Sequence, residues 1–284
     1  MKNTLKRIAL LLIVAVLLGG SFFLYSLSKT VRIPILMYHN IDETSDGNDT
    51  ITASLFEEQM KAISENGYTA LTFSDLQAYV DGKADLPDKP VVITFDDGYL
   101  STYVYAYPIL SRYGLNGTVF TIGTMVGTTT YKDTGLWTYP CFTYEQGREM
   151  FESGVIDVQS HSYDMHQWAP NETGDVIREN ALKLNDESDE EYLLALQNDF
   201  SLSKQLIEEN VGNQVFVLSY PHGLYSKISE EVSIDYGFSV TVTTTHGSNR
   251  LKQGDPSCLR VLNRYAITDS ITPDKLLNLL SRFW

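Results

Sequence analysis

The sequence holds only two cysteines, and they lie far apart. Cys141 and Cys258 are separated by 117 positions, and neither belongs to a CxxC pair or a Cys/His cluster. A zinc finger and a disulfide framework are therefore not indicated. A single long-range disulfide outside the cytoplasm and two buried thiols both fit this spacing.

Positive charge is scarce as well, since 21 Lys and Arg residues stand against 36 Asp and Glu residues. Residues 1–30 hold four of the basic residues and none of the acidic ones, so the rest of the chain carries a formal charge of −19. Such a surface argues against a nucleic-acid partner, because the phosphate backbone requires cationic contacts. A neutral polymer, or one that becomes cationic during a reaction, fits better, although an acidic surface also serves solubility alone.

Long apolar runs are missing except at the N-terminus. Residues 8–27 contain no charged side chain and follow a basic segment, residues 1–7. This length can span a bilayer, and the basic flank predicts that residues 1–7 stay in the cytoplasm. We therefore expect a single-pass signal-anchor in the cell membrane and an extracytoplasmic domain at residues 31–284. A cleaved signal peptide is the main alternative, although no A-x-A-like cleavage site follows, and a buried core helix is the last.

Strand-like apolar runs alternate with amphipathic helical runs over the remainder, without internal repeats or a low-complexity linker. The capping boxes Ser54-x-x-Glu57 and Ser74-x-x-Gln77 open two predicted helices, Ser54–Asn66 and one that ends near Gly82. About seven strand–helix units predict a parallel sheet and favour a closed or nearly closed barrel, with the site at the carboxyl ends of the strands. Strands are expected at Val31–Met37, Val91–Phe95, Thr118–Ile122, Ile156–Ser160, Val215–Ser219, Phe238–Val242 and Leu259–Ala266, and further helices at Tyr103–Tyr113, Tyr144–Glu152, Asp189–Asn210, Ser226–Tyr236 and Asp274–Phe283.

Two long irregular stretches, Gly123–Phe142 and His161–Ser188, begin at the ends of predicted strands. They carry several aromatic residues, among them Trp137 and Trp168. Aromatic faces can stack on sugar rings, and aromatic side chains can equally pack down irregular loops. Both interpretations stay open for these two tryptophans.

Two adjacent carboxylates, Asp96 and Asp97, stand where the predicted strand Val91–Phe95 ends, and Gly98 follows them. Neighbours on a strand point to opposite sides, but at a tight turn both side chains can face one cavity. Taken alone, an Asp-Asp-Gly sequence in an acidic protein is more simply a solvated turn.

A pair of histidines follows another predicted strand, Ile156–Ser160. His161 and His166 are two of only five histidines in the chain. Their i,i+5 spacing suits neither one helix face nor one strand face, so they must converge through a bend. With the Asp pair they supply one carboxylate and two imidazoles to a divalent ion and leave the second carboxylate free. Three protein ligands and an open position are typical of a catalytic zinc-type site, whereas a fourth ligand closes a structural one.

These motifs carry a family resemblance. Thr94–Gly98 matches the first motif of the polysaccharide deacetylases of carbohydrate esterase family 4, the NodB-homology domain, and Ser160–His166 is similar to a variant of the second. The resemblance implies a distorted (β/α)7 barrel, here preceded by the transmembrane segment. It extends over residues 90–125, 155–166 and 215–267.

The resemblance also implies a role for each polar residue of the two motifs. In the family the first Asp is the general base and the second binds the metal with both histidines. Asp96 would then be the base, and Asp97, His161 and His166 would be the ligands. Zinc is the expected ion, and an Asp-His-His set would also accept cobalt, nickel or iron.

The third motif departs from the family pattern Arg-x-Pro-aromatic-Gly. Ser219–Gly223 keeps the proline and the glycine but lacks the arginine. The usual Asp-Trp and late Leu-x-His motifs are also missing, and Leu262-Asn263-Arg264 stands near the place of the latter. With the opening segment Pro34–His39, these departures resemble the branch of poly-β-1,6-N-acetylglucosamine deacetylases, whose general acid is a histidine of the early Tyr-His segment.

His39 is therefore the general acid that the resemblance implies, and His222 and His246 are the competing candidates. The family places an oxyanion donor at the backbone N–H of the residue that is His222 here. We expect Tyr220 and Arg264 to belong to the same group of oxyanion and substrate contacts.

The resulting hypothesis is a metal-dependent hydrolase that removes N-acetyl groups from an extracellular aminosugar polysaccharide of the poly-N-acetylglucosamine type. A peptidoglycan deacetylase or an O-acetyl polysaccharide esterase is the enzyme alternative, because fold and metal do not choose the polymer. A non-catalytic surface polysaccharide-binding protein is the alternative of another class, and a retained base at Asp96 argues against it. The sequence leaves the oligomeric state open.

Overall fold

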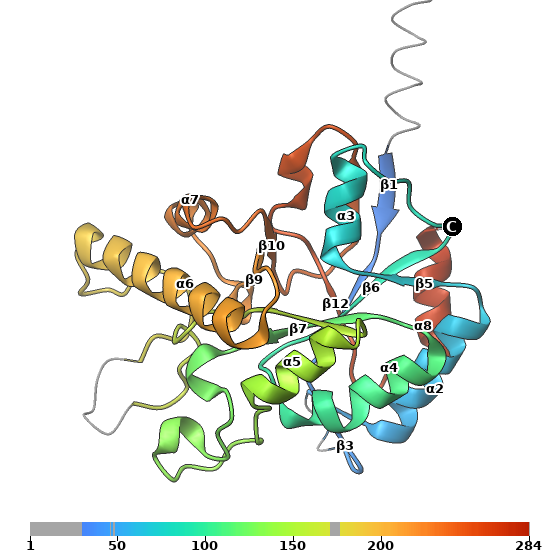
Figure 1. The fold of residues 1–284 in the computed structure, drawn as a ribbon, viewed down its shortest axis with the longest axis horizontal. Coiled ribbons are helices and arrows are strands. Elements are labelled where there is room, and N and C mark those ends of the chain that lie inside the picture. Colours follow the sequence, from blue (N-terminus) through green and yellow to red (C-terminus); the bar gives the residue numbers. More distant parts are fainter. Residues whose placement is uncertain (1–29, 46, 48, 171–176, 284) are drawn as a thin grey trace, which may run out of the picture.

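The computed structural model describes residues 30–45, 47, 49–170 and 177–283. Within these residues, eight parallel strands form the central sheet, and helices pack against it (Figure 1). The order along the sheet is β10-β9-β8-β7-β6-β2-β12, and β5 pairs with β6. The strands are β2 (Ile35–Tyr38), β5 (Thr69–Leu71), β6 (Pro90–Phe95), β7 (Gly117–Thr121), β8 (Ile156–Ser160), β9 (Val217–Ser219), β10 (Val240–Val242) and β12 (Tyr265–Ala266).

An irregular segment ahead of β12 joins the two ends of this sheet. The Thr243 N–H donates to the Leu262 carbonyl at 2.8 Å, and the Arg264 N–H donates to the Thr245 carbonyl at 2.9 Å. At the next residue the chain enters β12, which pairs with β2. The protein thus has an α/β fold whose half-barrel of parallel strands agrees with the distorted barrel predicted from sequence.

Side-chain alternation along β6 determines what reaches the inside of the sheet. Val91, Ile93 and Phe95 belong to the main hydrophobic cluster beneath the helices. Thr94 points the other way and is fully buried. Since side-chain direction repeats every two residues, Asp96 continues the face of Thr94.

The helices have defined starting signals, but two of these differ from the predicted ones. The N-cap of α2 is Thr52, whose hydroxyl accepts from the Leu55 N–H, rather than Ser54. The N-cap of α3 is Thr72, in a capping box with Asp75, rather than Ser74. The helices are α2 (Ala53–Glu65), α3 (Phe73–Val80), α4 (Tyr107–Tyr113), α5 (Tyr144–Glu152), α6 (Asp189–Val211), α7 (Lys227–Asp235) and α8 (Pro273–Leu280).

Three predicted elements are divided in the structure. The expected strand Val31–Met37 breaks at Pro34, which has no N–H to give to a ladder. Its first part, β1 (Thr30–Ile33), pairs antiparallel with β11 (Asn249–Lys252) outside the main sheet. The expected helix Tyr103–Tyr113 begins with a π-helical turn ahead of α4, and the expected strand Leu259–Ala266 keeps only β12. The short parallel pair β3 (Asn40–Asp42) and β4 (Thr50–Thr52) was not predicted.

The predicted cytoplasmic segment 1–7 and transmembrane segment 8–27 lie outside the described residues. Among the residues that the structure does describe, none of the helices is both long and apolar enough to cross a bilayer.

Candidate active site

The turn after β6 brings both carboxylates of the Asp pair to one side. Asp97 and Gly98 both have left-handed backbone conformations, with φ of 69° and 74°. A β-carbon at Gly98 would lie 2.5 Å from the Thr121 hydroxyl oxygen, so glycine is required by close approach as well as by φ. The turn therefore places Asp96, 2% exposed, beside Asp97 at the carboxyl edge of the sheet.

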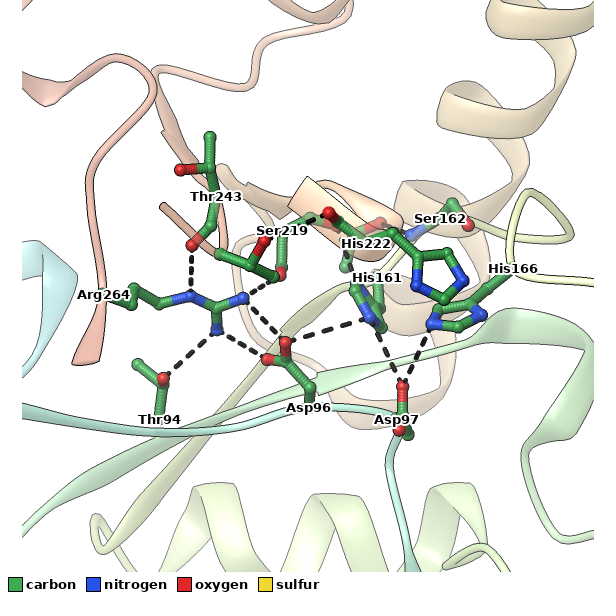
Figure 2. A network of polar contacts seen from close by, with 12 residues as sticks. Thr94, Asp96, Asp97, His161, Ser162, His166, Ser219, His222, Thr243 and Arg264 are labelled. Atoms are coloured by element: carbon green, nitrogen blue, oxygen red, sulfur yellow. Dashed lines mark hydrogen bonds and ion pairs between the residues drawn. The ribbon is translucent and has the colours of Figure 1, made fainter. Parts of the chain in front are cut away.

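The two predicted histidines converge on Asp97 through the expected bend. Ser162, directly after His161, has a φ of 71°, which reverses the chain between the two imidazoles. The Asp97 Oδ1 atom lies 3.4 Å from Nε2 of His161 and 3.6 Å from Nε2 of His166. Figure 2 shows the three side chains pointing toward one another from two strand ends.

The geometry of these three residues fits a divalent metal. Their ligand atoms all lie within 4.8 Å of one another. Tetrahedral zinc, with ligands about 2.0–2.2 Å away, separates neighbouring ligand atoms by roughly 3.3 Å, which is close to the two observed distances. Asp97 Oδ1 is buried and has no hydrogen-bond partner in the described structure. A buried carboxylate oxygen without a partner is costly, and a bound cation would satisfy it.

The hydrogen bond at His161 and the protonation state of His166 also suit metal binding. The His161 Nδ1 atom lies 2.8 Å from the Ser219 carbonyl oxygen. In the tautomer with Nδ1–H donating to this carbonyl, Nε2 is free to bind a metal. Burial lowers the pKa of His166 to about 4, so its imidazole is neutral at neutral pH. Burial would raise the pKa of Asp97, but His161 and His166 outweigh it and hold that pKa below its usual range.

Arg264 binds Asp96 with both terminal nitrogens of its guanidinium. Nη1 donates to Asp96 Oδ1 and Nη2 to Asp96 Oδ2, both at 2.7 Å. The remaining N–H groups donate to the Thr243 carbonyl at 2.8 Å, the Thr94 hydroxyl at 3.3 Å and the Ser219 hydroxyl at 3.0 Å. Arg264 is fully buried and all five of its N–H groups are used, so none is left for the substrate contact expected from the sequence.

Asp96 stays ionised in this environment. Burial raises the pKa of its carboxyl group, but the charge and hydrogen bonds of Arg264, together with His161 and His39, lower it below the usual value. The His161 Nε2 atom lies 4.0 Å from Asp96 Oδ2. An ionised carboxylate beside the candidate ligands is placed to accept a proton from a water molecule bound at that site.

His39 leaves the strand next to β6. Tyr38 of β2 pairs with Phe95 of β6, so the residues that follow, His39 and Asp96, emerge side by side. A positive charge on His39 would lower the pKa of both Asp96 and Asp97, which places its imidazole near the pair. His246 is exposed, and its ring packs edge-on against Tyr265 at 4.6 Å.

Comparison with known proteins identifies the family. The family model described as polysaccharide deacetylase matches residues 83–241, more than half of the chain. The chain belongs to the polysaccharide deacetylase family. The Bacillus subtilis (strain 168) protein YxkH, whose name refers to the same family, is 31% identical over 227 residues, which are 80% of this chain and 69% of that protein.

Two further relatives are named for removal of N-acetyl groups. The poly-beta-1,6-N-acetyl-D-glucosamine N-deacetylase of Staphylococcus epidermidis is 26% identical over 197 residues, which are 68% of this chain and 62% of that enzyme. This deacetylase thus spans less than two thirds of the staphylococcal relative. The solved structure of a de-N-acetylase from Aggregatibacter actinomycetemcomitans superimposes with a TM-score of 0.72 at 26% identity, covering 87% of this chain and 99% of that one. The family and these relatives make the chain an enzyme of the N-deacetylase type.

The Pro-His-Gly turn of the deacetylase lies at the edge of the cluster formed by Asp97, His161 and His166. Tyr220 is fully buried, and its hydroxyl donates to Glu230 at 2.8 Å, so its side chain faces away from a substrate. His222 is exposed and has a φ of 54°. The centroids of its ring and the ring of His166 are 4.5 Å apart. Figure 2 shows the two rings beside each other. Of the two residues, His222 alone stands at the open side of the cluster.

A small pocket opens beside the cluster, between the two long loops of the deacetylase. Its volume is about 50 Å³, and Asp97, His166, Tyr131 and Trp168 are among the residues that line it. Trp168 is 50% exposed and packs on Tyr131 with ring centroids 4.4 Å apart. Trp137 is 71% exposed and packs on Tyr139 instead. Trp168 therefore borders the site directly, whereas Trp137 does not line this pocket.

Sequence reasoning missed the bond between Arg264 and Asp96 and the place of Ser219 in it. Ser219 occupies the position at which the family motif has an arginine, and its hydroxyl accepts a hydrogen bond from Arg264. The signal available in sequence was an arginine absent from one motif and a second arginine, Arg264, near the end of the domain, which was expected to contact the substrate instead.

Proposed function

We propose that this deacetylase is a metal-dependent hydrolase that removes N-acetyl groups from an extracellular aminosugar polysaccharide of the poly-N-acetylglucosamine type. The observation that carries the proposal is Asp97 Oδ1, a buried and unpartnered carboxylate oxygen between two imidazole nitrogens. The family is metal-dependent, and the three ligand types suit zinc, cobalt, nickel or iron. Zinc is the ion we expect first.

Each residue has a distinct task in this reaction. The metal, when bound to Asp97, His161 and His166, would polarise the acetyl carbonyl group and lower the pKa of water. Asp96 accepts a proton from the attacking water, while Arg264 keeps the carboxylate ionised and oriented.

His39 and the Pro-His-Gly turn complete the proposed reaction. The water oxygen bonds to the acetyl carbon, which gives a tetrahedral species with a negatively charged oxygen, and the carbon–nitrogen bond of the amide then breaks. His39 donates a proton to the departing amine, which leaves as a free amino group while the acetyl group leaves as acetate. The backbone N–H of His222 is the candidate donor for the negative oxygen.

The surface around the site suits a neutral sugar polymer. Trp168 offers an exposed aromatic face beside the metal cluster, on which a sugar ring can stack. The adjoining pocket of about 50 Å³ is far smaller than the 300–1,000 Å³ typical of drug-sized ligands and fits a small acyl group. The acidic chain would attract the amino groups that the reaction creates.

Product analysis on defined oligomers tests this proposal. The purified domain, loaded with zinc, would be incubated with β-1,6-linked and β-1,4-linked N-acetylglucosamine oligomers and with an O-acetylated polysaccharide. We expect acetate and free amines from the β-1,6-linked oligomers. Preferred cleavage of β-1,4-linked oligomers would support a peptidoglycan deacetylase instead, and cleavage of the O-acetyl polymer alone would support an esterase. Binding without acetate release would support the non-catalytic alternative.

We also propose that residues 8–27 anchor the enzyme in the cell membrane, with the catalytic domain outside the cytoplasm. The uncharged run behind a basic flank supports this placement. Protease added to intact cells should then degrade the domain, and the full-length protein should fractionate with membranes. A full-length protein recovered from the cytosol would contradict the anchor, and N-terminal sequencing of a secreted form would indicate a cleaved signal peptide.

A further inference from the structure

The loop between the two metal-binding histidines is held from behind by a buried acid on α6. The Asp199 carboxylate accepts the backbone N–H of Tyr163 at 2.9 Å through Oδ1 and that of Asp164 at 2.6 Å through Oδ2. Asp199 is 7% exposed and lies in the middle of α6, ten residues from the start of that helix. A carboxylate with one oxygen on each of two successive amides fixes both the position and the orientation of the loop.

The loop is also held by the chain after β7, where the Gly123 and Thr124 N–H groups donate to the Ser162 and Tyr163 carbonyls at 3.1 and 2.9 Å. Asp199 links the loop to the helix layer instead.

Two further bonds of the loop, both to serine hydroxyls, are local. The Met165 N–H donates to the Ser162 hydroxyl at 3.1 Å, and the Ser162 N–H donates to the Ser160 hydroxyl at 3.1 Å. Ser160 in turn contacts Ser203, one helical turn after Asp199, with 2.6 Å between the hydroxyl oxygens. The two α6 residues therefore hold the end of β8 and the loop on one helix face.

Burying this carboxylate is unfavourable unless its bonds to the loop offset the cost. Burial raises the pKa of Asp199 to about 7, whereas the Tyr163 and Asp164 amides lower it and so favour the ionised form. A carboxylate accepts both N–H groups, but an amide side chain of the same shape presents an NH₂ group to one of them. Asparagine at this position would therefore place its NH₂ group against one of the two backbone N–H groups, and neither group can accept a hydrogen bond.

From this geometry we propose that Asp199 is a positioning residue for metal binding. It holds the His161–His166 loop in the bend that brings both imidazoles to Asp97, so that the cluster is preorganised before the ion arrives. Outer-sphere partners of metal ligands commonly act in this way. The inference rests on the proposed metal dependence but concerns a residue that touches neither the metal nor the substrate.

The matched control is Asp157, another carboxylate with two hydrogen-bond donors. Its oxygens accept from Asn213 at 2.9 Å and from Gln159 at 2.8 Å. It lies on β8 four residues ahead of His161, about 13 Å along the strand. Asp157→Asn and Asp199→Asn each replace one of two acceptor oxygens with a donor, but only the second change faces the loop.

The experiment measures the zinc dissociation constant of the metal-free domain by competition with a chromophoric chelator. Asp199→Asn should weaken zinc binding by about 10–100-fold. Asp157→Asn should stay within about threefold of wild type, because distant sites without shared partners act independently. Thermal unfolding of the metal-free proteins would show both variants folded. Equal zinc affinity in Asp199→Asn and wild type, or an equal loss in Asp157→Asn, would overturn the proposal.

Hydrogen exchange on the metal-free wild-type domain tests the same point without a variant. The Tyr163 and Asp164 amides should be protected before any ion is added, because they donate to a buried carboxylate. Exchange at the rate of an unstructured chain, with protection appearing only on zinc addition, would overturn the role of Asp199. A wild-type domain that binds no zinc would refute the proposed metal dependence, whereas the exchange result would still decide whether Asp199 holds the loop.

Discussion

Arg264 reaches Asp96 from a different segment of the chain than the one that the family pattern predicts. Its Nη1 and Nη2 atoms each lie 2.7 Å from a carboxylate oxygen, and Nη2 also lies 3.0 Å from the Ser219 hydroxyl. Ser219 stands where the motif normally has arginine. A guanidinium therefore lies beside the base in this chain too, but the segment before β12 supplies it.

The first prediction concerns removal of this guanidinium. Arg264→Met should lower the free energy of unfolding by about 3–5 kcal/mol, because it leaves a buried carboxylate without its partner. It should also raise the pKa of Asp96, since Arg264 lowers it in the wild type. On the acidic side of the pH profile, the fall of kcat/KM should then occur at higher pH than in wild type, while zinc content is retained.

Arg260 provides the control for this variant. It lies four residues earlier, has a side chain only 14% exposed and pairs with Glu230 at 3.0 Å rather than with Asp96. Arg260→Met should destabilise the fold without shifting the pH at which kcat/KM falls. The double variant Ser219→Arg with Arg264→Met should recover part of the lost activity, because it returns the guanidinium to the family position. A fall of kcat/KM at the wild-type pH in Arg264→Met would refute the role assigned to Arg264.

The second prediction separates the base from the metal ligands. His161→Ala and His166→Ala each remove one of three ligand atoms and should abolish both zinc content and deacetylation. Asp96→Asn should keep zinc near wild-type content and lose the rate, because the amide cannot accept the proton of the water. Zinc content by elemental analysis and acetate release give the two readouts. Loss of zinc in Asp96→Asn would show that Asp96 is a ligand and not the base.

The third prediction concerns the proton donor. His39→Ala should lower kcat by about 10²–10⁴-fold, the usual contribution of a general acid, with zinc content and thermal stability near wild type. His246→Ala should cost much less, because that ring lies against Tyr265 at the surface. The reversed result, an active His39→Ala and an inactive His246→Ala, would remove His39 from the mechanism.

The grouping of Asp97, His161 and His166, the proposed metal ligands, could be predicted from sequence because their motifs follow buried strands. Asp97 and His161 come within two residues of β6 and β8, and parallel strands bring their carboxyl ends to one edge. Strand alternation likewise predicts that Asp96 faces inward. The i,i+5 spacing of His161 and His166 indicated a bend, and the structure supplies it at Ser162.

Residues that act through tertiary contacts could not be found in this way. Arg264 meets Asp96 across 168 positions, and Asp199 meets the His161–His166 loop from the middle of an ordinary amphipathic helix. Neither lies in a local pattern that marks its partner. The same limit explains the shortened β12. The sequence of Leu259–Ala266 predicts a strand, but its middle part forms irregular hydrogen bonds that join the two ends of the sheet.

The fourth prediction concerns the pH dependence of stability and uses Asp157. Burial raises the pKa of this carboxyl group to about 6, although Asn213 and Gln159 donate to it and lower it. The unfolded chain loses this proton near pH 4, so between about pH 4 and 6 the folded protein binds a proton that the unfolded chain does not. The contribution of Asp157 to stability therefore falls as pH rises through this window.

Asp157→Asn removes this titrating group. The difference in free energy of unfolding between the variant and wild type should therefore change with pH in one direction. The free energy of unfolding of the variant minus that of wild type should rise between pH 4 and pH 7. Two pKa units correspond to nearly 3 kcal/mol, and screening of the partly exposed side chain reduces the expected rise to about 1–2 kcal/mol. Urea unfolding at several pH values measures this difference, with Asp235→Asn, at an exposed position of α7, as the baseline. A difference that stays constant or falls with pH would show that Asp157 is ionised as readily in the folded protein as in the unfolded chain.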